Sequence, residues 1–260
     1  GMLTVVNFAH GAYFMMGAYI GVYVLDITGS FLASLLAVFF SVGLLGLLTE
    51  RVLVRPLYGR GPDYPLLLTF GLSYVIIDVI RMIFGVEGLQ SPTPTALQGS
   101  VNIGIGYFPV YRLFLIAAAA VVITALWLFI EKSRYGLIIR AGARDPEIVR
   151  ILGIDVAKVW LLVFGLGTAI AGLSGILAAP IRTVTPEMGI PVLVESFVVT
   201  VVGGMGSLGG AVVAGLLVGV VYSLTALYAP ALAELSIFAL MALVLVVRPQ
   251  GLFGRAGLME

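Results

Sequence analysis

The sequence predicts an all-α fold: a polytopic membrane helix bundle with a glycine-broken or re-entrant segment near residues 192–227. Of the 260 residues, 61% are hydrophobic and 10% are charged, whereas soluble domains carry about 25% charged residues. The mean hydropathy of +1.16 applies to the whole chain, so a leader peptide before a soluble domain cannot account for it. The 33 glycines suit membrane helices that approach one another closely.

Apolar windows of membrane-spanning length occur along the whole chain, and a span needs about 20 mostly apolar residues. We expect spans at 3–25, 31–48, 66–84, 113–130, 159–179 and 232–247, with the glycine-broken region 192–227 before the last. No window has the alternation of a strand series. Residues 1–260 are therefore expected to form a single transmembrane domain.

The basic residues predict the orientation of these spans, because short loops rich in Lys and Arg stay in the cytoplasm. They gather in the loop 49–64, in the stretch 131–158 and in the tail after Arg248, so these three segments are expected to be cytoplasmic. The connections 85–112 and 181–191 carry one basic residue each and are expected to lie outside.

This orientation constrains the glycine-broken region. Because the last span alone runs from outside to the cytoplasmic tail, residues 192–227 must begin and end outside, and so cross twice or not at all. As a helix, residues 192–202 would rise only about 17 Å, which is too short to span. A short descent, a turn at 203–210 and a return helix fit these constraints. Bent backbone at membrane depth needs protein or a water-filled cavity around it, which predicts that this region lines a path.

The stretch 131–158 contains the signals of a short surface helix. Asp145 can cap it, Pro146 suits its first position, Glu147 favours its positive start, and Gly153 can end it. Four apolar residues are more than a short solvated helix needs: Ile148, Val149, Ile151 and Leu152. They favour a surface for a partner protein. The alternative is a helix packed on its own bundle or lying among lipid headgroups.

Other polar or glycine-rich positions leave two interpretations open. The run Gly204–Gly209 has the spacing G-x-G-x-x-G, but it lies between membrane segments, so helix packing and contact with a substrate carboxylate are the alternatives. Asn7 and His10 stand in the first apolar stretch, where they are either functional or make interhelical hydrogen bonds. Asp78 and Arg81 are three residues apart and are expected to form an ion pair on one helix face.

The composition excludes several function classes. The chain has no cysteine and one histidine, so disulfides, thiolate metal sites and histidine clusters are excluded, and no cofactor is expected. A net charge of +1 gives no electrostatic footprint for nucleic acid. The sequence lacks G-x-S-x-G, H-E-x-x-H and a G-K-[ST] phosphate loop. We therefore expect a transport protein and not an enzyme, with any nucleotide-driven work done by another chain.

Four motifs in order carry a resemblance to a known family. They are Val6–Gly11 followed by Gly17–Tyr19, the loop Arg140–Gly153, the run Val201–Gly210, and the closing Arg248–Leu252. Together they resemble the membrane permease subunits of branched-chain amino acid ABC transporters. The likeness covers nearly the entire chain.

This resemblance implies a permease subunit of an ATP-driven importer for leucine, isoleucine and valine in a bacterial or archaeal plasma (inner) membrane. It also implies a second related permease subunit, two cytoplasmic ATPase subunits and an extracytoplasmic substrate-binding protein. The loop matching the family's ATPase-coupling segment comprises Ala141, Gly142, Arg144, Asp145, Pro146, Glu147, Ile148, Val149, Ile151, Leu152 and Gly153. Our hypothesis for the translocation path comprises Asn7, His10, Gly203, Gly204, Gly206 and Ser207.

Several alternatives stay open at this point. Relatives of this family carry urea, short amides or other amino acids. An ion-coupled secondary transporter would need a carboxylate inside the bilayer, and only Asp78 and Glu195 come near. A channel and a membrane enzyme are further alternatives. Family members usually have one more span before the motif at Asn7, so we expect the chain to lack an N-terminal span.

Overall fold

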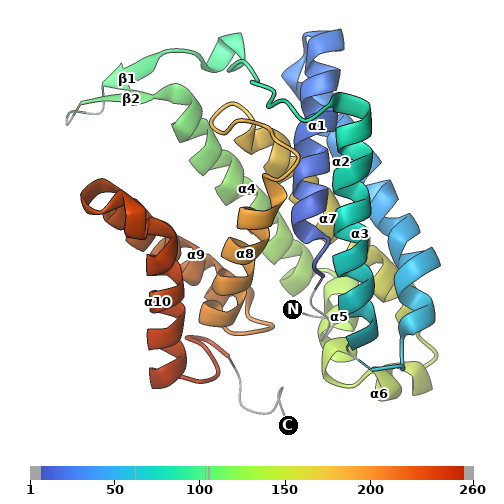
Figure 1. The fold of residues 1–260 in the computed structure, drawn as a ribbon. Coiled ribbons are helices and arrows are strands. Elements are labelled where there is room, and N and C mark those ends of the chain that lie inside the picture. Colours follow the sequence, from blue (N-terminus) through green and yellow to red (C-terminus); the bar gives the residue numbers. More distant parts are fainter. Residues whose placement is uncertain (1–6, 62, 103, 105, 255–260) are drawn as a thin grey trace. The chain divides into compact units, whose positions relative to one another are not determined.

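The computed structural model describes residues 7–254 except residues 62, 103 and 105. This part of the chain is almost entirely helical (Figure 1), which confirms the predicted all-α class. Its ten α-helices are α1 (His10–Thr28), α2 (Phe31–Thr49), α3 (Asp63–Phe84), α4 (Val110–Lys132), α5 (Arg134–Arg144), α6 (Pro146–Ile151), α7 (Val156–Ala178), α8 (Gly189–Gly203), α9 (Leu208–Tyr228) and α10 (Ala233–Val247). A π-helical turn, η1 (Glu50–Val54), continues α2 directly and leads into a short 3-10 turn, η2 (Arg55–Leu57).

Among the described residues, seven helices are long and apolar enough to cross a membrane: α1, α2, α3, α4, α7, α9 and α10. Six of them fall on the predicted spans with small shifts at their ends, and α9 lies in the glycine-broken region, for which the sequence left two crossings or none open. A multi-pass membrane protein is thus confirmed. The first predicted span differs most, since α1 begins at His10 and not at residue 3, and residues 3–6 lie outside the described part. The Asn7 side chain accepts a hydrogen bond from the Ala9 N–H (3.0 Å), which shapes the turn before α1.

The helices fall into two compact units, residues 7–189 and residues 190–254, which are described separately. In the first unit, α1, α2 and α7 pack together at the centre, and every residue of α1 from Gly11 to Tyr19 is buried. A methyl group at Gly17 would collide with the Gly172 backbone, and one at Gly175 would collide with the Phe14 carbonyl. These glycines therefore allow α1 and α7 to cross closely, as small residues do in membrane bundles.

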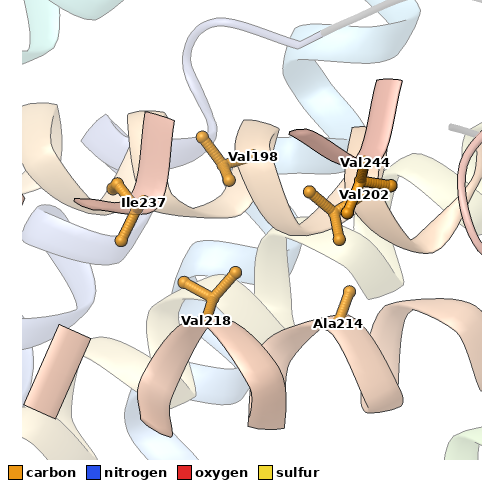
Figure 2. Packing of buried hydrophobic residues seen from close by; sticks show 6 residues of the cluster. All are labelled: Val198, Val202, Ala214, Val218, Ile237 and Val244. Carbon is orange, nitrogen blue, oxygen red and sulfur yellow. The ribbon is translucent and has the colours of Figure 1, made fainter. Parts of the chain in front are cut away.

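In the second unit, α8, α9 and α10 enclose a cluster of small aliphatic side chains, shown in Figure 2. The buried members are Val198, Val202, Ala214, Val218, Ile237 and Val244. Because these side chains are short and mostly β-branched, they pack with little loss of rotamer freedom. The cluster holds the predicted glycine-broken region against the last span.

One element was not predicted. The strands β1 (Ser100–Asn102) and β2 (Tyr107–Pro109) pair antiparallel in the connection between α3 and α4. Three residues are too few for an alternating pattern to be recognised in a sequence. The same connection is tied to the segment after α7 by an isolated bridge between Leu89 and Val184.

Candidate functional site

The short helix α6 has the caps that the sequence predicts. The Asp145 carboxylate accepts hydrogen bonds from the backbone N–H groups of Glu147 and Ile148, each at 3.0 Å. At the other end Gly153 has φ +78°, and the Ile154 N–H donates to the Val149 carbonyl over 3.3 Å. A residue with positive φ followed by this backward hydrogen bond ends a helix. The side chains of Arg144 and Pro146 lie outside the described part.

The apolar residues of α6 divide between two faces. Ile148, Ile151 and Leu152 are 56%, 83% and 71% exposed. Val149 is 3% exposed, so the prediction that all four belong to one partner surface is wrong at this position. Val149 is covered by the rest of this chain, since α6 packs against α5 and α7. Below, "α6 face" means Ile148, Ile151 and Leu152.

A second helix, α5, precedes α6 and was missed in the sequence. Ser133 caps it by accepting from the Gly136 N–H (2.9 Å), and Arg140 donates to the Ile130 carbonyl and pairs with Glu131 at 3.1 Å. Gly142 is buried, and a methyl group there would lie 3.5 Å from the Trp160 ring, whereas Ala141 is exposed and Asp145 is half-buried. The signal that could have found α5 is the i, i+3 spacing of Gly136, Ile139 and Gly142, which are all buried.

The two predicted cytoplasmic loops meet. The Arg55 guanidinium, which follows α2 and η1, donates to the carbonyl of Ala157 in the first turn of α7 (3.2 Å). Loop 49–64 and stretch 131–158 therefore lie at the same end of the helices, as the distribution of basic residues predicts.

The glycine-rich turn between α8 and α9 is tightly packed. Gly204 and Gly206 have φ of +93° and +83°, and the Ser207 hydroxyl caps α9 by accepting from the Gly210 N–H (3.0 Å). A methyl group at Gly203 would lie 2.6 Å from the Gly210 carbonyl carbon. The packing interpretation of these glycines is thus supported by direct backbone contact.

The chain after α10 folds back onto this turn, a contact that sequence reasoning missed. The Leu252 N–H donates to the Val202 carbonyl (2.8 Å), and the Phe253 N–H donates to the Gly203 carbonyl (3.1 Å). The motif at Val201–Gly210 and the motif at Arg248–Leu252, about fifty positions apart, are therefore in contact at the end of the unit where α10 ends. At 15 residues α8 rises about 22 Å, less than the ~30 Å of hydrocarbon, and it is not among the seven candidate spans, whereas the 21-residue α9 is. This is the short helix, glycine-rich turn and longer helix expected from the sequence.

The other polar residues singled out from the sequence lie before or in α1, in α3 and in α8. Asn7 shapes the turn before α1, and His10 occupies the first position of α1, half-buried. The predicted ion pair between Asp78 and Arg81 is confirmed at 2.9 Å, and Arg81 also binds Glu187 at 2.5 Å. That hydrogen bond lowers the pKa of Glu187, which lies in the connection between α7 and α8. Glu195 lies half-buried in α8.

Comparison with known proteins identifies the family. Residues 1–247 match the family model described as "Branched-chain amino acid transport system / permease component". The chain belongs to this family. It is 29% identical to the high-affinity branched-chain amino acid transport system permease protein BraD of Pseudomonas aeruginosa, over 98% of this chain and 88% of that protein.

Two further relatives have a similar sequence identity to this chain. The high-affinity branched-chain amino acid transport system permease protein LivH of Escherichia coli K12 is 28% identical over 98% of this chain and 87% of that protein. A probable branched-chain amino acid transport permease protein LivH of Methanocaldococcus jannaschii is 28% identical, over 86% of this chain and 73% of that protein. No solved structure matches the chain. The chain is thus a multi-pass membrane permease.

Proposed function

We propose that this chain is the permease subunit of an ATP-driven importer for leucine, isoleucine and valine, and that a separate cytoplasmic ATPase docks on the α6 face. The proposed substrate is supported by the similar proteins, which are branched-chain amino acid transport permeases, one of them a probable one, from Pseudomonas aeruginosa, Escherichia coli and Methanocaldococcus jannaschii. Urea, short amides or other amino acids remain the alternative cargo.

The observation that carries the ATPase proposal is the α6 face itself. Two large aliphatic side chains, Ile148 and Ile151, stand exposed on the six-residue helix α6, and a third, Leu152, stands exposed directly after it, outside the seven candidate spans of the described part. A lipid-facing helix within the bilayer would expose such residues as a rule, but a helix at the aqueous end would not. Burial of this face in a groove of a partner protein removes the apolar surface from water.

An ion-coupled secondary transporter receives less support. Such a protein needs an intramembrane carboxylate that can change its protonation. Asp78 is exposed and already paired with Arg81 on the same helix, at 2.9 Å. The predicted substrate-path residues Asn7, His10, Gly203, Gly204, Gly206 and Ser207 stay hypotheses.

The other partners are also proposals. A second permease subunit would complete the pore, and an external binding protein would deliver the amino acid. Helix α4 supports the first of these, because only Tyr111 and Ile130 of its 23 residues are buried. A helix so little covered by its own chain faces lipid or another subunit on nearly all sides.

The test is substitution of Ile148 by Asp in the complete transporter, reconstituted with its ATPases in liposomes. We expect the amount of copurified ATPase and leucine uptake to fall by at least about tenfold, because a desolvated carboxylate in an apolar contact costs more than the roughly 1.4 kcal/mol of a tenfold change. Ile148→Leu is the matched control and should behave as wild type. Normal ATPase binding by Ile148→Asp would refute docking through this face.

A further inference from the structure

A fully buried carboxylate lies where α2 ends. Glu50, the first residue of the π-helical turn η1, has 0% of its side chain exposed. The Arg55 guanidinium binds both of its oxygens, Nη2 to Oε2 at 3.2 Å and Nε to Oε1 at 3.4 Å, and the Tyr58 hydroxyl donates to Oε1 at 3.1 Å. Burial and the nearby Glu50 carboxylate raise the pKa of Tyr58, so the phenol stays protonated as a donor. "Glu50 cluster" below means Glu50, Arg55 and Tyr58.

The Glu50 cluster reaches the helix that follows α6. Arg55 Nη2 also donates to the Ala157 carbonyl, at 3.2 Å. Ala157 is held from the other side as well, because its N–H donates to the capping carboxylate of Asp155 at 3.1 Å. Only the four residues 152–155 separate α6 from α7, and the turn at Gly153 is hydrogen-bonded to α6. The position of α6 therefore depends on where Ala157 is held.

The opposite end of the Glu50 cluster reaches the centre of the bundle. Thr49, the neighbour of Glu50, accepts a hydrogen bond from the Tyr13 hydroxyl at 2.6 Å. Tyr13 lies in the buried half of α1 and packs edge-on against Phe164 of α7, with ring centroids 6.5 Å apart. A continuous set of contacts thus runs from the start of α7, through Arg55 and Glu50, to the central helix α1.

Stability alone is a poor reason for this arrangement. Desolvating two charges is unfavourable, and well-packed apolar residues of similar size usually stabilise a fold equally well. What a bidentate Arg–carboxylate pair supplies is a defined geometry. A π-helical turn in a helix is also a feature that is frequent at functional sites.

We propose that Arg55, held by Glu50 and Tyr58, is a positioning residue that fixes α6 relative to α1 and α2 and transmits the movement of a docked ATPase to these helices. The inference rests on the proposed function, since it needs an ATPase at α6. In this proposal Arg55 acts on the Ala157 carbonyl and not on the transported amino acid.

The test compares Arg55→Lys with Arg51→Lys in the complete transporter in liposomes. Lysine keeps the charge beside Glu50, but its single ammonium cannot bind both carboxylate oxygens and the Ala157 carbonyl in the fixed geometry of a guanidinium. Arg51 lies on the same turn η1 with its side chain exposed, so Arg51→Lys is the matched control. The readout is the number of radiolabelled leucine molecules taken up per ATP hydrolysed.

We expect Arg55→Lys to bind the ATPases and to hydrolyse ATP without substrate at a rate within about twofold of wild type. Leucine uptake per ATP should fall by about tenfold, the effect expected when one charge-assisted hydrogen bond is lost. Tyr58→Phe, which removes one neutral donor and no charge, should give a smaller loss in the same direction. Arg51→Lys should match wild type.

Two outcomes would overturn the inference. One is an unchanged ratio of uptake to hydrolysis in Arg55→Lys. The other is a parallel loss of assembly, hydrolysis and uptake, which would mean that the Glu50 cluster only stabilises the fold. A wild-type complex that binds no ATPase or takes up no leucine would instead refute the proposed function, so the two failures are distinguishable.

Discussion

The substitution Gly251→Ala, which adds one methyl group, tests the close contact between the tail and the α8–α9 turn. The φ of Gly251 is +79°, and a Cβ there would lie 2.6 Å from the Gly204 nitrogen, 2.6 Å from the Val201 carbonyl oxygen and 2.7 Å from the Gly204 Cα. All three are backbone atoms, so no side-chain rotation can relieve the collision. The tail must then move away from the turn.

The expected cost of Gly251→Ala has two parts. An L-residue in the left-handed region costs about 1–2 kcal/mol. Displacement of the tail weakens the hydrogen bonds of Leu252 and Phe253 to the turn, at about 1 kcal/mol each. The sum is about 3–4 kcal/mol, which for a chain of this size corresponds to a fall in Tm of roughly 6–16 °C.

Two glycines of the same chain separate these contributions. Gly29 has φ +65° and nothing within 4 Å of a Cβ, so Gly29→Ala should incur only the conformational cost. Gly219 lies inside α9 and also has open space around a Cβ, so Gly219→Ala should leave Tm unchanged or raise it.

The assay is thermal unfolding of the three purified variants in one detergent, followed by the monodisperse fraction on size exclusion. We expect Gly219→Ala to have the highest Tm, Gly29→Ala an intermediate Tm and Gly251→Ala the lowest. A Gly251→Ala variant that melts at or above Gly29→Ala would refute the contact between tail and turn.

Two further predictions concern the path and the orientation. Gly206→Leu should abolish leucine uptake while the subunit still assembles, because Gly206 has φ +83° and a branched side chain is strained there. Two results together would mean that this turn serves helix packing alone: normal uptake by the assembled variant, and a Ser207→Cys thiol that neither substrate nor binding protein protects from labelling. The chain has no cysteine, so Arg144→Cys supplies a unique thiol, which should react only with reagents that reach the cytoplasm; labelling from outside intact cells would contradict the orientation.

Much of this protein could be predicted from its sequence because the bilayer imposes one simple requirement. Every span needs a long apolar helix with its backbone bonded internally, so the windows alone located six of the seven candidate spans among the described residues, and only α9 had been left open. The caps of α6 were equally predictable, since Asp145 and Gly153 act on backbone groups within one turn of themselves.

Tertiary structure alone decided which side of each element meets a neighbour. Nothing local distinguishes Val149, which is buried, from Ile148, which is exposed, because the two are adjacent and equally apolar. The glycine-rich turn and the tail around Gly251 are in contact although about fifty residues separate them in the sequence, and about one hundred residues separate Arg55 from Ala157. Hydropathy and capping are properties of neighbouring residues, whereas these contacts depend on how helices of similar composition pack, which a single sequence does not encode at any one position.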